Sequence, residues 1–129
     1  MTPLSLPFVT IVGLAGAGGA VSRYLVGRFF AERAGSRFLL GTLVINVTGA
    51  FLSGLLFALV GHKLITAGQQ VVLATGFLGG FTTFSTMSWE GVQLMRGGKT
   101  ASSLLYLGGS VALGLVFTVL GLLVGGWSR

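Results

Sequence analysis

The sequence predicts an all-α membrane protein with four transmembrane helices, and three observations predict it. Of the 129 residues, 53% are hydrophobic and only 8% are charged, and the mean hydropathy is +0.94. Soluble domains average roughly 25% charged residues, so an ordinary water-soluble fold is excluded. The apolar residues also form four long runs, each of about the 20 residues that a helix needs to cross a bilayer. The connections are short, which indicates one membrane domain over residues 1–129.

The charged residues lie mostly at the ends of these runs, where they suit lipid headgroups. The net charge of +6 therefore indicates no nucleic-acid partner. The chain has no Cys, its single His ends a run, and one of its two Glu residues is placed in a loop, so nothing indicates an enzyme. The basic residues are assigned to the first, second and third connections in this order: Arg28, Arg33 and Arg37; Lys63; Arg96 and Lys99.

The first span is predicted over residues 8–30, and it opens after Pro7, a residue tolerated at a helix start. The stretch from Gly13 to Ala20 has little side-chain volume, which permits close approach of another helix. Arg23 lies in the same span. A charge there costs roughly 2.5–3.5 kcal/mol on insertion scales, so Arg23 should face an aqueous vestibule, a partner or the membrane interface.

The second and fourth spans are predicted over residues 38–60 and 102–126. The second carries one strongly polar residue, Asn46, and a small-residue packing face of the form Ala50-x-x-x-Gly54. The fourth carries Tyr106 and Ser110 in its first half and the pattern Gly121-x-x-x-Gly125 in its second half.

The third span, over residues 70–95, is predicted to be interrupted near mid-membrane. Gly79 and Gly80 are followed by a cluster of hydroxyl residues, and both glycine and β-branched threonine are poor helix formers. The carbonyls and amides freed by such a break must meet protein, water or an ion.

Polar side chains within the spans are mostly hydrogen-bond donors, and Arg23 adds a fixed positive charge. This chemistry favours an anion, because a cation path would want carboxylates. Phe81, Phe84 and Met87 recur at a spacing of three, and aromatic edges carry partial positive charge. Taken singly, each hydroxyl can instead bond to its own helix, and the aromatic stripe can be packing.

The sequence resembles the Fluc (CrcB) fluoride channels, which are small bacterial membrane proteins, and the resemblance covers nearly the whole chain. Three ordered motifs carry it: Gly18-Gly19-Ala20-x-x-Arg23-Tyr24 in the first span, Gly41-Thr42-Leu43-x-x-Asn46-x-x-Gly49 in the second, and Gly76-Phe-Leu-Gly79-Gly80-Phe-Thr82-Thr83-Phe84-Ser85-Thr86 in the third.

The resemblance implies an antiparallel, dual-topology homodimer in the bacterial inner membrane that passively exports fluoride through two pores. It implies that Asn46 and Phe84 line each pore and that Arg23 is a vestibule charge. It also implies a structural Na⁺ at the dimer centre, held by the backbone carbonyls of Gly79 and Thr82. The remaining residues implied for the pore are Ser85, Thr86, Glu90, Tyr106 and Ser110.

Two features depart from the family pattern. Met87 stands where the family usually has its second pore phenylalanine, and a polarizable thioether there is still expected to line the pore. The Lys and Arg count is also uneven. One side carries five such residues and the other side carries Lys63 and Arg129, whereas dual topology needs a near balance.

Two alternatives remain open from the residues. A small dual-topology multidrug exporter has a similar length, but it needs a carboxylate early in the chain, and the first span has none. A non-transporting membrane scaffold would use the small residues and hydroxyls only for helix packing, with Asn46 as a packing contact.

Overall fold

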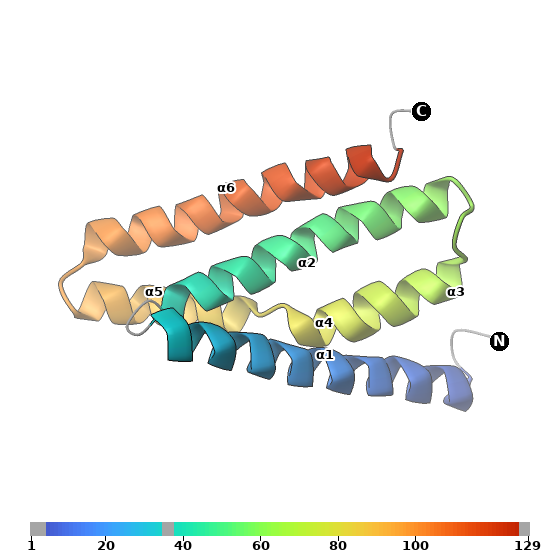
Figure 1. Cartoon of the computed structure of the whole chain (residues 1–129), viewed down its shortest axis with the longest axis horizontal. Helices are drawn as coiled ribbons and strands as arrows, with labels where there is room; N and C mark the ends of the chain where they lie inside the picture. The colour runs from blue at the N-terminus through green and yellow to red at the C-terminus, as the bar shows by residue number, and fades with distance from the viewer. Residues whose placement is uncertain (1–4, 35–37, 127–129) are drawn as a thin grey trace.

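The computed structural model describes residues 5–34 and 38–126, and within them all regular structure is helical (Figure 1). Three long helices are α1 (Leu6–Ala34), α2 (Phe38–Gly61) and α6 (Thr100–Val124). The third span consists of four pieces in series: α3 (Ala67–Gln70), the π-helical η1 (Val71–Leu78), α4 (Gly79–Phe81) and α5 (Phe84–Arg96). Four stretches are long and apolar enough to cross a membrane: Leu6–Arg33, Leu40–Gly61, Ala67–Arg96 and Thr100–Val124. The predicted four-span architecture is confirmed.

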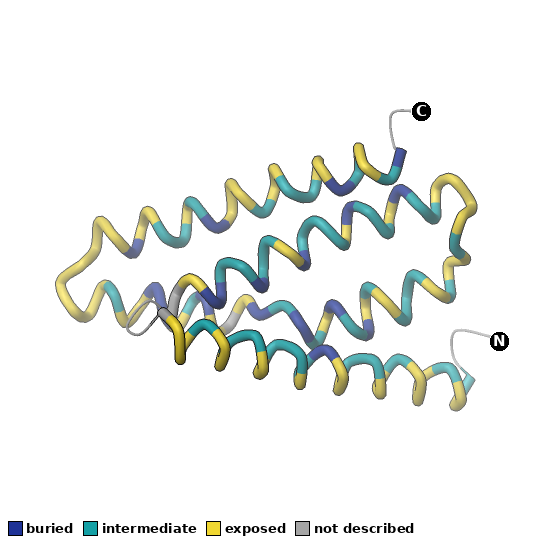
Figure 2. The backbone as a smooth tube through the Cα atoms, viewed as in Figure 1, coloured by how far each residue is buried: buried dark blue, intermediate teal, exposed yellow. Residues whose placement is uncertain are grey.

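The helices pack as two pairs of long neighbours. α2 runs beside α6, while α1 runs beside η1 and α4, and α5 packs against α6 (Figure 1). Buried residues form narrow strips where the helices face one another, and the outer faces of α1 and α6 are largely exposed (Figure 2). A small hydrophobic core of Ile45, Leu78 and Phe81 joins α2 to the third span.

Glycines bring the backbones into contact, as their clustering predicts. A Cβ atom on Gly19 would collide with the carbonyl oxygen of Phe77 and would lie 2.9 Å from the nitrogen of Phe81. On the other side of the bundle, a Cβ atom on Gly121 would collide with the carbonyl oxygen of Phe51. The small residues of α1 and α6 therefore serve close helix packing.

The third span is broken, as predicted, but the break follows the paired glycines instead of coinciding with them. Gly79 and Gly80 are helical residues of α4, and the extended backbone lies at Thr82 (φ −82°, ψ 158°) and Thr83 (φ −149°, ψ 109°). The glycines keep a helical conformation because α4 packs directly on the backbone of α1, where a Cβ atom on Gly80 would meet the carbonyl of Gly16.

The first helix is longer than predicted, so the placement of three charged residues in a connection or loop was wrong. Arg28, Glu32 and Arg33 all lie within α1. Arg28 Nε donates to Glu32 Oε1 at 2.7 Å across one turn, and the Arg33 guanidinium lies 3.9 Å from the ring centre of Phe29. Such contacts stabilise a polar helix end. Arg37 and Arg129 lie outside the described residues.

Candidate functional site at the break in the third span

Asn46 holds the break with both ends of its side-chain amide. Its Nδ2 donates to the carbonyl oxygen of Thr83 at 3.0 Å, and the backbone N–H of Thr83 donates to Oδ1 at 2.9 Å. The side-chain amide thus acts as a peptide group supplied from α2, 37 residues earlier in the chain. This pairing satisfies backbone groups that a bilayer interior would not solvate.

Gly49, one turn after Asn46 on α2, makes room for the other residue of the break. A Cβ atom on Gly49 would collide with the side-chain methyl group of Thr82. The Thr82 hydroxyl donates to the carbonyl oxygen of Leu78 at 2.9 Å, which closes the end of α4. The spacing Asn46-x-x-Gly49 therefore places a polar clamp and a gap on the same face of α2.

The carbonyl groups of Gly79 and Thr82 are among those that the break releases from their usual helical donors. In a continuous helix, the N–H of Thr83 would donate to Gly79 and the N–H of Thr86 to Thr82. Here the N–H of Thr83 donates to Asn46, and that of Thr86 donates to the Thr83 hydroxyl at 3.2 Å. Gly79 is exposed and Thr82 is half-buried in the single chain. Both carbonyls therefore have acceptor capacity that a hard cation suits.

Thr83 is also the N-cap of α5, and it is a site residue that the sequence interpretation missed. Its hydroxyl accepts from the Thr86 N–H and donates to the Thr86 hydroxyl at 2.9 Å. The local signal was present, because a threonine directly before the first residue of an apolar-periodic stretch is a typical N-cap. The positive end of the α5 dipole begins here.

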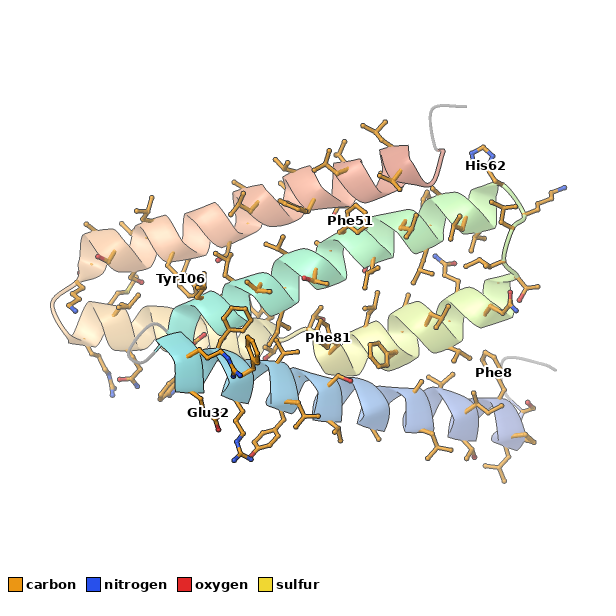
Figure 3. The ribbon with its side chains drawn as sticks, in the orientation of Figure 1. Phe8, Glu32, Phe51, His62, Phe81 and Tyr106 are labelled. Atoms are coloured by element: carbon orange, nitrogen blue, oxygen red, sulfur yellow. The ribbon has the colours of Figure 1, made fainter. Side chains whose placement is uncertain are left out.

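A groove of about 580 Å³ opens beside the α5 N-terminus. It lies between α1, α2 and the break, and Figure 3 shows the side chains that project from these elements. Among its described lining residues are two guanidinium groups and four hydroxyls, three from threonines and one from Tyr24, and none carries a carboxylate. The groove therefore favours anions, and Arg23 is one of the residues that line it. The lining residues are Arg23, Tyr24, Gly27, Arg28, Ala31, Thr42, Ile45, Thr83 and Thr86.

Two further groups of predicted site residues lie on α5 and α6. Met87 is buried at 7% exposure, with its sulfur 3.9 Å from Asn46 Nδ2. Glu90, at 3% exposure, accepts from the Tyr106 hydroxyl at 3.0 Å, which links α5 to α6. Figure 3 places Tyr106 on the inner side of α6. The Ser110 hydroxyl donates to the Tyr106 carbonyl at 2.6 Å, so its proton serves its own helix.

Other predicted site residues stay on the outside of the single chain. Phe84 is 76% exposed, and Thr86 is exposed as well, so the chain alone does not bury them beside Asn46. The Ser85 side chain lies outside what the structure describes. Phe81, the first member of the aromatic stripe, belongs to the core and stacks on Phe77 with ring centres 5.9 Å apart. The regular stripe therefore divides between core, surface and site.

Comparison with known proteins identifies the family of the chain. Residues 10–122 match the family model described as CrcB-like protein, Camphor Resistance (CrcB). Two relatives, from Acidobacterium capsulatum and Rhizobium meliloti, are each named fluoride-specific ion channel FluC and are 44% identical over 115 residues, which are 88% of this chain and 92% of theirs. A third of the same name, from Aquifex aeolicus, is 42% identical over 118 residues, 91% of this chain and 95% of its own. With its four spans and Asn46-clamped break, the chain belongs to the CrcB family.

Proposed function

We propose that this chain forms a fluoride-selective channel that passively exports fluoride from the cytoplasm across the bacterial inner membrane. The observation that carries the proposal is the groove at the break, where Arg23, three threonine hydroxyls and the N-terminus of α5 meet in a transmembrane bundle. Membership in the CrcB family, whose relatives are named fluoride-specific channels, supports the choice of ion.

The hydrogen-bond donors along the groove indicate that the permeating ion is an anion. Hydroxyl, amide and guanidinium groups replace the water that a small anion sheds, whereas a cation path would need carboxylates or carbonyls along the groove. From the groove, Asn46 and Met87 lead toward the Glu90 and Tyr106 pair. We assign Ser85, Thr86 and Ser110 to the polar side of this path.

We further propose that two antiparallel copies complete two pores. Phe84 and Thr86 directly follow the break and are exposed in the single chain, so a second subunit would cover them. Exposed apolar side chains along α1 and α6 provide surface for a partner or for lipid. If a partner covers Phe84, the ring edge of Phe84 would form part of the pore wall. Met87 would line the pore beside it with a flexible, polarizable thioether.

A structural Na⁺ is proposed at the dimer centre, held by the carbonyls of Gly79 and Thr82 from both subunits. The N–H groups that would bond these carbonyls in a helix are engaged elsewhere, which supports oxygen ligation of a hard cation. The ion would supply positive charge that stabilises the paired breaks. Replacing Na⁺ by N-methylglucamine should lower the thermal unfolding temperature of the dimer, and returning Na⁺ should restore it. Unchanged unfolding in both buffers would contradict the ion site.

Fluoride efflux from liposomes tests the proposed function. Purified protein reconstituted with internal fluoride should release it roughly 100-fold faster than chloride, which corresponds to a difference of about 2.7 kcal/mol between the two barriers. Ion-selective electrodes measure both ions, and protein-free liposomes are the control. Equal release of both anions would contradict selectivity. Release of neither by an intact dimer would favour the scaffold alternative.

A further inference from the structure

The groove carries two positive charges that both come from α1. Arg23 and Arg28 both line it, and their spacing of five residues corresponds to a rise of about 7.5 Å along the helix. An anion entering from the membrane surface would therefore meet Arg28 before Arg23 and then the hydroxyls at the start of α5.

A carboxylate is paired with the outer of these two charges. Glu32 Oε1 accepts from Arg28 Nε at 2.7 Å, one turn further along α1 (Figure 3 labels Glu32 near the end of this helix). The chain has only two acidic residues, and the other, Glu90, is buried in α5. Glu32 therefore brings a negative charge to a groove mouth that is otherwise positive.

The ion pair of Arg28 and Glu32 is exposed, so its electrostatic potential acts on ions in the surrounding solvent. The side chains of Arg28 and Glu32 are 62% and 57% exposed, so they act through water and are screened by salt. An exposed pair of this kind adds little to folding. Its effect on the local concentration of anions does not depend on that stability, because the potential at the mouth is the sum of all nearby charges.

We propose that Glu32 is a negative counter-charge at the mouth of the groove, which through its ion pair with Arg28 lowers the rate at which anions enter toward Arg23. The inference rests on the proposed function, since it takes the groove as the anion entrance. Glu32 acts on anions through Arg28 and through the electric potential at the groove mouth. It is therefore a positioning residue that sets the rate of anion entry into the groove, whereas the groups around Asn46 set selectivity.

Glu32→Gln and Arg28→Gln test the inference with opposite expected signs. At low fluoride and low ionic strength, Glu32→Gln should raise fluoride efflux about two-fold and Arg28→Gln should lower it about two-fold, the change expected for one charge about 10 Å away in water. The double variant should fall between them. Near 1 M impermeant salt, where the Debye length is about 3 Å, every ratio to the unchanged protein should approach one.

The chain offers matched controls at the same helix end. Arg33→Gln removes the same charge, but Arg33 stacks on Phe29 and is not among the groove residues, so its effect should be smaller than that of Arg28→Gln. Glu32→Asp keeps the charge and should keep the low efflux. The fluoride-to-chloride ratio should be the same in all variants, because a surface charge attracts both anions.

Several outcomes would overturn the inference. Efflux of Glu32→Gln equal to that of the unchanged protein at low salt, an equal effect of Arg33→Gln and Arg28→Gln, or a rise that persists at high salt would each contradict a local field at the mouth. Failure of the unchanged protein to conduct fluoride would instead contradict the proposed function. The two failures are therefore separated in the same set of liposomes.

Discussion

Asn46→Asp should reduce fluoride efflux by roughly two orders of magnitude or more. The Asp carboxylate can still accept from the Thr83 N–H, but it loses the donor that Nδ2 gives to the Thr83 carbonyl. An unpaired buried carbonyl costs about 1–3 kcal/mol, and the new negative charge repels an anion in a region of low dielectric constant. The substitution therefore removes a donor and reverses the sign of the potential at the same point.

Efflux from liposomes and thermal unfolding in detergent separate these two effects. Asn46→Ala removes the clamp without adding charge, so it should lower the unfolding temperature and reduce efflux less than Asp does. Thr48→Ala, at an exposed position two residues along α2, is the matched control and should leave both measurements unchanged. Efflux by Asn46→Asp at the rate of the unchanged protein would exclude Asn46 from the path.

The spans and the presence of the break could be predicted from local sequence, whereas the position of the break could not. Composition and run length identify four membrane helices without any knowledge of packing. Helix propensity marks glycine as a poor helix former, yet Gly79 and Gly80 are helical because α4 packs against α1. The chain leaves the helix at Thr82 and Thr83, where an amide from 37 residues earlier satisfies the backbone.

The same difference separates the site residues that could be found from those that could not. Arg23 and Asn46 could be identified because a strongly polar side chain inside a membrane span is costly and usually has a functional role. Thr83 could not be told apart from the neighbouring hydroxyl residues by sequence. Its role depends on its hydrogen bonds with the Asn46 side chain and on its position as the N-cap of α5. Arg28 and Glu32 were missed because the apolar run ends near residue 30, whereas α1 continues to Ala34 and brings the two side chains together across one turn.

Gly80→Val should have a large effect on folding, destabilising the protein by about 3 kcal/mol or more, the upper part of the range for overpacked interiors. A Cβ atom on Gly80 would collide with the carbonyl oxygen of Gly16 and lie 3.1 Å from the nitrogen of Ala20. Both groups belong to the backbone of α1, which cannot rotate away as a flexible side chain can. α1 and α4 would have to separate.

Gly13→Val is the matched control, because a Cβ atom on Gly13 meets nothing within 4 Å in the chain. Thermal unfolding in detergent should show a large decrease for Gly80→Val and a small one for Gly13→Val. Equal decreases would mean that valine in a helix, and not the crossing of α1 and α4, determines the loss. Separation of these helices would also shift the groove wall that carries Arg23 away from the break. Any Gly80→Val protein that still folds should therefore lose fluoride efflux as well.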